Sequence, residues 1–296
     1  MPLSDNMRGA FLMMAAMATF TLNDTLVKAA SASVPLFQLI LIRGIVTTSV
    51  IALIAYNKGA LNFDFSRRDW LLILFRTFGD ICATVFFLLA LFQMPIANVT
   101  AILQVMPLGI TLAGAVFLGE KVGWRRYGAI LIGFSGVMLI VRPGSDGFDF
   151  YSVYALISVG FVVVRDLTAR QLSRSVPSLS VALINSAAIT AMGAVMTVYL
   201  GWQPVSGQSF QIILGASGFL VAGYLLSVMA MRVGELAAVA PFRYTALLWA
   251  IGLGIAVFGN YPDRLTLLGS AIVVGMGLYT FYRERKLAAR VQKAPI

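Results

Sequence analysis

The pentapeptide SASVP at residues 31–35 returns as SRSVP at residues 173–177, which is 142 positions later in a chain of 296 residues. The same offset relates NDTLVK at residues 23–28 to RDLTAR at residues 165–170. Both hexapeptides hold an aspartate that is followed four positions later by a basic residue. Two matches at one spacing indicate that the chain consists of two related halves.

A third match lies near the end of each half. AILIG at residues 129–133 and AIVVG at residues 271–275 keep the offset of 142. Landmarks near the start and the end of both halves favour a duplication over a chance match. We therefore place the two repeats at residues 1–142 and 143–296.

The composition is that of a membrane protein. Hydrophobic residues make up 59% of the chain and charged residues 11%, whereas soluble domains carry about 25% charged residues. A chain this apolar has too little polar surface to cover a globule, and so lipid is the expected solvent for most of it. The single cysteine, Cys82, excludes an intrachain disulfide. The lack of histidine removes the usual metal ligand, and no metal or other cofactor is expected.

Ten stretches are long enough to cross a bilayer, because a transmembrane helix needs roughly 20 mostly apolar residues. Lipid accepts only helices or closed barrels, and these runs lack the two-residue alternation of barrel strands. We therefore predict an all-α integral membrane protein with transmembrane helices at residues 8–29, 36–56, 70–93, 96–118, 124–141, 149–170, 178–200, 211–231, 235–258 and 264–282. Four glycines are expected to allow close helix packing, namely Gly128, Gly133, Gly275 and Gly277.

The positions of Lys and Arg orient these helices, because cytoplasmic segments carry the excess of positive charge. With the N-terminus in the cytoplasm, fifteen basic residues between the helices lie inside and only Arg142 and Arg264 lie outside. Both termini are therefore expected in the cytoplasm, and a bacterial inner membrane is the expected location. The same distribution accounts for the formal net charge of +10, and so no nucleic acid partner is expected.

Each half holds five helices, an odd number, so the second half enters the membrane from the opposite side. Inverted repeats in secondary transporters supply two near-equivalent conformations, one open to each side, with the substrate site near the midplane. Asp24 and Lys28 would lie near the outer end of their helix, and Asp166 and Arg170 near the inner end of theirs. These mirror-related positions suit alternating gates.

Two further stretches carry a family resemblance. ILQVMPL at residues 102–108 places Pro107 inside the fourth helix, and LGEKV at residues 118–122 closes that helix. With ten helices in two halves, the chain resembles the drug/metabolite transporter superfamily in its EamA-like branch. The resemblance implies a secondary transporter of amino acids, metabolites, nucleotide sugars or drugs. FGN at residues 258–260 departs from the pattern, because Asn260 stands where the family often keeps an acid.

Charged side chains within the helices are candidates for gating or coupling, because a charge in mid-bilayer costs at least ~2.5–3.5 kcal/mol on insertion scales. From their depths we predict an ion pair between Asp24 and Arg43 and another between Arg76 and Asp166. Arg165 is expected to point away from its neighbour Asp166. Such pairs act as gates or only fix the helix packing. The candidate gating or coupling set is Asp24, Lys28, Arg76, Arg165, Asp166 and Arg170.

Five bases against three acids within the helices leave a surplus of positive charge. Desolvated guanidinium groups suit a carboxylate or a phosphate. Arg243 in PFRYTALLW is the strongest candidate to bind one, because its approximate repeat mate Gln104 is uncharged. A structural bridge to Asp80 is the alternative for Arg243, and Asp80 is also a candidate to carry a coupling proton. The candidate substrate-binding set is Arg243, Arg43, Tyr244, Gln104, Trp249 and Asp80.

The leading function is a secondary transporter of a small polar metabolite, anionic or zwitterionic, such as an amino acid or another carboxylated metabolite. ATP is not expected to drive it, because the chain lacks a G-x-x-x-x-G-K-[ST] loop. A flippase for an anionic lipid is the alternative, since the same arginines could hold a lipid phosphate. An integral-membrane enzyme is disfavoured by the lack of clustered His, Cys or carboxylates. The expected partners are a small metabolite and the lipid bilayer, and a homodimer is left open.

Overall fold

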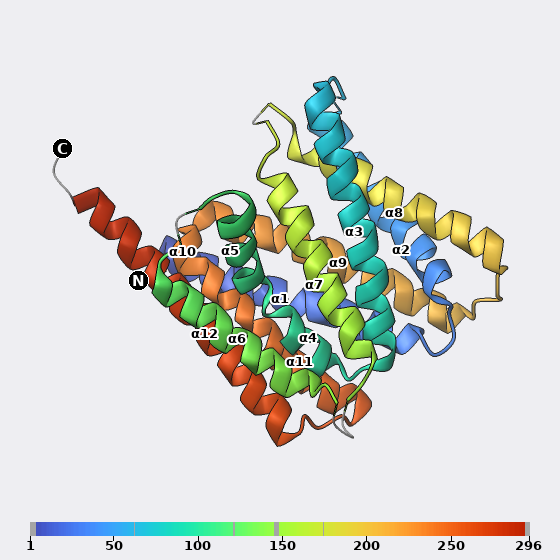
Figure 1. Cartoon of the computed structure of the whole chain (residues 1–296). Coiled ribbons are helices and arrows are strands. Elements are labelled where there is room, and N and C mark those ends of the chain that lie inside the picture. Colours follow the sequence, from blue (N-terminus) through green and yellow to red (C-terminus); the bar gives the residue numbers. More distant parts are fainter. Residues whose placement is uncertain (1–3, 62, 121, 145–147, 174, 294–296) are drawn as a thin grey trace. The chain divides into compact units, whose positions relative to one another are not determined.

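The computed structural model describes residues 4–61, 63–120, 122–144, 148–173 and 175–293. Within these ranges the chain is helical and holds no strand. Ten helical segments of the described part are long and apolar enough to cross a membrane (Figure 1), so the prediction of an all-α protein with ten spans is confirmed to that extent. Lys121 and Arg174, which the orientation argument counts as cytoplasmic, lie outside the described residues.

Eight of the spans in the described chain are single helices, and the fourth and ninth are built from shorter segments treated below. Each predicted stretch overlaps one observed span. The start of α9 differs most in unit 2, because this helix begins at Gly207, four residues before the predicted stretch. The single helices are α1 (Asp5–Ala30), α2 (Leu36–Asn57), α3 (Arg67–Gln93), α6 (Trp124–Val141), α7 (Tyr151–Ala169), α8 (Ser178–Leu200), α9 (Gly207–Val233) and α12 (Arg264–Lys293).

Proline and glycine set the ends of several helices. Pro35 and Pro177, the last residues of the repeated pentapeptides, directly precede α2 and α8. Proline suits this place because the first helical turn does not use its missing N–H. Gly201 and Gly259 follow helices with φ values of 89° and 67°, which glycine adopts without a steric penalty. The repeated pentapeptides thus mark equivalent helix starts in the two halves.

The chain forms two compact units. Unit 1 comprises Met1–Thr21, Met94–Val153 and Ala222–Ile296, and unit 2 comprises Leu22–Gln93 and Tyr154–Val221. The helices α1 and α9 each contribute to both units. Each unit also combines segments from both sequence halves, and the division of the sequence into two repeats at residue 142 stays a prediction.

In unit 2, α2 packs closely against α8. A Cβ atom added to Gly193 would lie 2.9 Å from the backbone nitrogen of Leu41, and one added to Gly44 would lie 3.0 Å from Cβ of Thr190. The Oγ1 atoms of Thr48 and Thr190 lie 3.0 Å apart and share a hydrogen bond. Small residues therefore bring the two helix backbones together, as is common between membrane helices.

The two ends of this helix pair are held by matching hydrogen bonds. Gln38 at the start of α2 donates from Nε2 to the carbonyl oxygen of Gln203, beyond the end of α8, at 2.7 Å. Ser180 at the start of α8 donates from Oγ to the carbonyl oxygen of Ala60, beyond the end of α2, at 2.6 Å. Gln38 and Ser180 are 142 positions apart in the sequence. Helices α2 and α8 are therefore antiparallel, and equivalent residues of the two halves make equivalent contacts.

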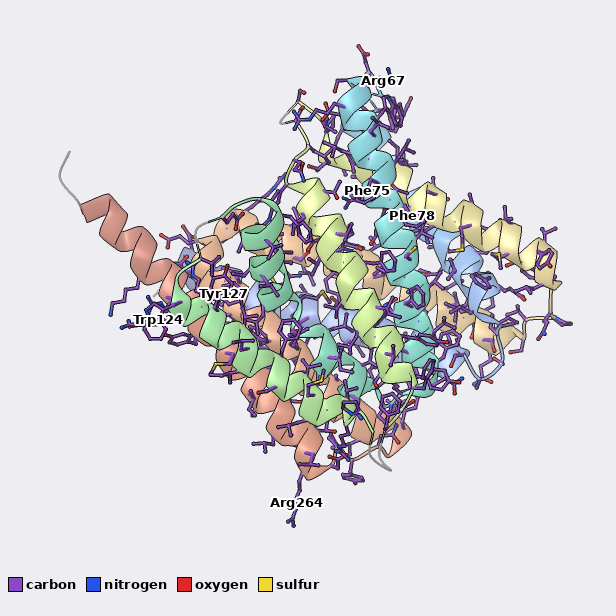
Figure 2. All side chains as sticks on the ribbon, in the orientation of Figure 1. Arg67, Phe75, Phe78, Trp124, Tyr127 and Arg264 are labelled. Atoms are coloured by element: carbon purple, nitrogen blue, oxygen red, sulfur yellow. The ribbon has the colours of Figure 1, made fainter. Side chains whose placement is uncertain are left out.

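In unit 1, α6 packs against α12 along much of its length (Figure 1). A Cβ atom added to Gly136 would lie 2.8 Å from the carbonyl oxygen of Gly269, and one added to Gly269 would lie 2.5 Å from that of Gly136. Figure 2 places Trp124, which begins α6, and Arg264, which begins α12, at opposite ends of the pair. The two helices are therefore antiparallel, with backbone against backbone at this glycine contact.

An ion pair joins the end of α6 to the start of α12. Arg142 follows α6 in a left-handed conformation and contacts the Asp263 carboxylate through Nη2. The same carboxylate accepts a hydrogen bond of 2.9 Å from the backbone N–H of Thr266, in the first turn of α12. Asp263 thus caps the start of α12 and also binds Arg142, the residue that follows α6.

This ion pair predicts an acid-sensitive contribution to stability. Burial by itself raises the pKa of Asp263, but the hydrogen bonds from Thr266 and Arg142 outweigh it and hold the pKa below its ordinary value of 3.8. A folded-state pKa below the unfolded one gives stability that is present above the unfolded pKa and lost as the pH falls through the folded pKa. We expect Asp263→Asn to lower the melting temperature at pH 7 by the equivalent of less than about 1 kcal/mol, since the pair is half exposed.

The measurement is the melting temperature of the wild type and of Asp263→Asn as a function of pH. Their difference should be constant near neutral pH and shrink below pH ~4, the ordinary range of an aspartate pKa. A difference of the same size at pH 3 and pH 7 would contradict the role of the charge.

Large apolar side chains point away from the helices rather than into a core. Figure 2 shows Phe75 and Phe78 projecting from α3, and each is 57% exposed. Trp124 is 78% exposed at the start of α6. An apolar surface of this kind is expected where lipid replaces water as the solvent, with tryptophan near the membrane interface.

Candidate functional site

The fourth span is interrupted between two short helices of unit 1. Helix α4 (Ile96–Leu103) ends before Gln104 and Val105, and α5 (Met106–Phe117) begins after them. Pro107 lies in the first turn of α5, where its missing N–H prevents one continuous ladder of hydrogen bonds. Non-helical backbone inside a membrane span is tolerated where it is buried in protein or lines a cavity.

The ninth span, also in unit 1, is interrupted at the equivalent place. It consists of α10 (Leu236–Val239), the 3-10 helix η1 (Ala240–Tyr244) and α11 (Thr245–Phe258). A proline lies at the start of η1. Arg243 follows Gln104 by 139 positions, so the two predicted repeat mates both lie where their spans lose regular α-helix geometry.

A hydrogen bond joins the two interruptions. Gln104 donates from Nε2 to the backbone carbonyl oxygen of Tyr244 at 3.2 Å, and α4 packs against α11 around it. The Tyr244 side chain is buried, with 6% of its surface exposed. The structure therefore brings together Gln104 and Tyr244, two of the predicted substrate-binding residues, from opposite halves of the chain.

Arg243 precedes Tyr244 and differs from it in its surroundings. It is exposed, and it makes no hydrogen bond or ion pair with any residue in the described ranges. Its guanidinium group carries N–H donors in a fixed fork that matches a carboxylate or a phosphate. Trp249 lies on α11 and is 45% exposed, so its ring is free to contact lipid or a ligand.

Unit 2 holds a charged network on α3, α7 and α8. Arg165 on α7 donates from Nη1 to Asp80 Oδ1 on α3 at 2.8 Å, and from Nε to Asp166 Oδ1 at 2.8 Å. Asn185 on α8 donates to the other carboxylate oxygen of Asp80. The side chains of Asp80 and Arg165 are 14% and 27% exposed. One arginine is thus shared by two carboxylates, and the network ties three helices together.

The network corrects one prediction and leaves another open. The expectation that Arg165 points away from Asp166 is wrong, because the long arginine side chain folds back onto its neighbour. Arg76 is partly buried on α3, one helical turn before Asp80, and its predicted pairing with Asp166 stays a prediction. Arg170 follows the end of α7 and is exposed.

The other predicted pair lies elsewhere in unit 2. Arg43 on α2 attracts Asp24 on α1 electrostatically, while the ion pair between them stays a prediction, and Asn23 donates from Nδ2 to Asp24 Oδ1 at 2.8 Å. Lys28 lies one turn after Asp24 and donates from Nζ to the carbonyl oxygen of Leu91 at 2.8 Å. Leu91 is in the last turn of α3, where a cation also interacts favourably with the helix dipole. Lys28 therefore connects the ends of α1 and α3.

Sequence reasoning missed Asn185. The signal that could have found it is the repeat itself, since Asn185 follows Arg43 by 142 positions. Arg43 accompanies the aspartate of the first hexapeptide, and Asn185 joins the network that contains Asp166, the aspartate of the second. Because Asn185 is neutral, a search for charged residues within the helices does not identify it.

Comparison with known proteins finds a match to a transporter family. Residues 7–142 match the EamA-like transporter family. The resemblance inferred from the sequence is confirmed by this match, and the chain also has relatives among metabolite transporters.

Three of these relatives show how far the likeness extends. An S-adenosylmethionine uptake transporter of Rickettsia felis is 26% identical over 198 residues, 66% of either chain and so just under two thirds of that protein. The pseudopaline exporter CntI of Pseudomonas aeruginosa is 26% identical over 90% of this chain and 93% of its own length. A riboflavin transporter of Vibrio cholerae is 29% identical over 62% and 61% of the two chains. The names of these relatives describe transporters and not enzymes.

A solved crystal structure shares the fold of this chain. The TM-score is 0.65, and the alignment covers 94% of this chain and 98% of the other. The sequences are 19% identical. At this identity the likeness supports the ten-helix architecture alone.

Proposed function

We propose that this protein is a secondary transporter that moves a small polar metabolite, anionic or zwitterionic, across a bacterial inner membrane by alternating access. An amino acid or another carboxylated metabolite is the proposed substrate class. The observation that carries the proposal is the guanidinium group of Arg243, which has no hydrogen bond or ion pair among the described residues although it lies at an interruption of a membrane span. Both termini are placed in the cytoplasm by the positive-inside rule.

The two interrupted spans support a substrate site in unit 1. Discontinuous helices in transporters expose backbone groups and helix ends that bind substrates near the midplane. Here the interruption of the ninth span carries Arg243, and that of the fourth carries Gln104, which binds the carbonyl of Tyr244. An arginine as anchor, with Tyr244 and Trp249 near it along the chain and Gln104 bonded to the Tyr244 carbonyl, suits a carboxylate with a polar or aromatic body.

The names of two relatives also support the proposed substrate class. One is named for uptake of S-adenosylmethionine, which carries the α-amino and carboxylate groups of an amino acid. Another is named for export of pseudopaline. A carboxylate-bearing amino acid derivative is therefore a sound first probe for this protein.

Contacts between α2 and α8 support an inverted repeat, which the alternating-access mechanism needs. Thr48 bonds to Thr190, its own mate at an offset of 142. Gln38 and Ser180, also mates, bond to the segments that follow each other's helix. A two-fold axis near Thr48 would relate these pairs. The proposal takes this axis as the relation between the two repeats.

The charged groups of unit 2 are the proposed gates. Asp24 with Arg43 would close the outer side, and Arg165 with Asp80 and Asp166 the inner side. Asp24 and Asp166 both lie near the C-terminal ends of their helices, and these two helices are expected to cross the membrane in opposite directions. Ion pairs of this kind hold helices together in one conformation and separate in the other. Lys28, Arg76 and Arg170 belong to the same proposed set.

The test is a thermal-shift screen of the detergent-purified protein against a panel that includes S-adenosylmethionine, glutamate, riboflavin and neutral sugars. A ligand that binds the native state raises the melting temperature, by the equivalent of about 2.7 kcal/mol at a hundred times its Kd. We expect a carboxylated compound to stabilise the wild type. We also expect Arg243→Gln to weaken that compound at least about 30-fold, as for the loss of one partner of a desolvated charge pair.

The matched control is Arg232→Gln, which removes an exposed arginine from the last turn of α9 and should leave the affinity unchanged. Stabilisation by neutral compounds alone, or equal affinity in Arg243→Gln and the wild type, would contradict the proposal. Stabilisation by an anionic phospholipid but by no soluble metabolite would favour a flippase instead.

A further inference from the structure

The side chain of Tyr244 lies in a place that only a glycine leaves open. Its phenol ring occupies the space that a Cβ atom at Gly277 of α12 would take, with ring atom Cε2 at 3.0 Å from such a Cβ and the hydroxyl closer still. Phe281, one helical turn further along α12, meets the Tyr244 ring edge to face, with centroids 6.3 Å apart at 68°. Tyr244 is therefore seated on α12 between Gly277 and Phe281.

The fourth span is seated in a similar way. The side chain of Leu108, just after the interruption, occupies the space of a Cβ at Gly133 of α6. In each interrupted span, one side chain thus packs onto a glycine of the last helix in its half: Leu108 on Gly133, and Tyr244 on Gly277. The expectation of close packing is correct for Gly133 and Gly277, whereas a Cβ at Gly128 or Gly275 would meet open space.

The hydroxyl of Tyr244 is not needed for this packing. It is buried and has no hydrogen-bond partner within the described part of the chain. A buried polar group without a partner is unfavourable compared with an apolar group of the same shape. A phenylalanine would fill the same seat, so the hydroxyl has no structural role here that the contacts reveal.

We infer that Gly277 is a specificity-determining residue of the substrate site, and that it acts by seating Tyr244. This inference rests on the proposed function. The seat fixes the Tyr244 ring, and with it the carbonyl oxygen that Gln104 binds at 3.2 Å and the adjoining Arg243. A side chain at position 277 displaces the tyrosine, and the guanidinium of the adjoining Arg243 then no longer lies where it meets the ligand.

The ligand group that this placement selects is a carboxylate. Arg243 offers it a forked donor, whereas the Tyr244 hydroxyl is buried against α12 at Gly277. Gly277 therefore acts through the position of Arg243 and not through the hydroxyl.

The experiment compares Gly277→Ala with Gly275→Ala, a substitution in the same helix that meets open space. The panel compound that binds the wild type is titrated against each variant, and transport is measured in proteoliposomes. We expect Gly277→Ala to weaken binding by about tenfold to a hundredfold, the range for a catalytic or binding group displaced by about 1 Å. Gly275→Ala should bind like the wild type.

Two further variants separate a ligand role from a packing role. Tyr244→Phe keeps the ring packed between Gly277 and Phe281, so it should hold or raise the melting temperature of the ligand-free protein and leave the affinity for the ligand unchanged. In a Tyr244→Ala background, Gly277→Ala should have no further effect on affinity, because the side chain that it displaces is gone.

The outcomes distinguish this inference from the proposed function. If a carboxylated compound binds the wild type and Gly277→Ala with equal affinity, Gly277 is a packing glycine and the inference is overturned while the function stands. A lower melting temperature in Gly277→Ala with unchanged affinity leads to the same conclusion. If no compound of the panel binds the wild type, the proposed function and this inference both fail.

Discussion

Replacing Arg165 with glutamine is expected to lower the free energy of unfolding by about 3–5 kcal/mol, the range for removing one partner of a buried ion pair. The guanidinium group is shared by Asp80 and Asp166, with hydrogen bonds of 2.8 Å to each. Its removal leaves two carboxylates without their counter-charge in a membrane-spanning bundle, where charges are poorly solvated. The melting temperature of the detergent-purified variant measures the effect.

The control for this prediction is Arg67→Gln. Arg67 begins α3, is exposed and points away from the helices (Figure 2), so its loss should change stability by no more than about 0.5 kcal/mol. Adding Asp80→Asn to Arg165→Gln should recover part of the loss, since one uncompensated carboxylate disappears. Equal melting temperatures for Arg67→Gln and Arg165→Gln would show that the network does not stabilise the fold.

Gly269→Ala is expected to destabilise the pair of helices α6 and α12 by about 1–3 kcal/mol, the usual range for overpacking. The added Cβ would lie 2.5 Å from the carbonyl oxygen of Gly136 and 2.7 Å from Cγ1 of Ile140. The first of these neighbours is backbone, which cannot turn aside as a side chain can. The two helices must therefore move apart along a contact that Gly136 and Gly269 make tight.

The matched control is Gly275→Ala in the same helix. An alanine is the better helix former by about 0.5–1 kcal/mol, and at position 275 nothing opposes that gain because a Cβ meets open space. The melting temperature should therefore rise for Gly275→Ala and fall for Gly269→Ala. A rise in both variants would mean that α6 and α12 are not held at the separation described above.

The spans were predictable from the sequence because the bilayer dictates the length of an apolar run. The interruption of the fourth span was not predicted, and residues 96–118 were expected as one helix, although Pro107 is a signal that could have indicated the break. The interruption of the ninth was not predicted, and residues 235–258 were expected as one helix. Their apolar character is continuous, and the 3-10 segment Ala240–Tyr244 depends on packing against other helices rather than on local composition.

The candidate site was predictable as a set of residues but not as a set of contacts. Intramembrane charges stand out in the sequence, and depth alone identified the attraction between Asp24 and Arg43. Depth could not show that Arg165 reaches two carboxylates at once, because a long side chain can bend along its own helix. Neutral partners such as Asn185 and Gly277 carry no signal of their own, and only the folded arrangement reveals them.

The pairing of helices from opposite halves has a consequence for biosynthesis. Helix α2 packs on α8 and α6 packs on α12, so the partner of each early helix is made much later. When α2 enters the membrane, Gln38 and Thr48 face lipid or provisional neighbours until residues near 190 have been synthesised. The helices of the first half must therefore wait in the bilayer without these partners. The contacts of unit 2 can form once residues up to Val221 have been made, whereas those of unit 1 form only after α12 has been made.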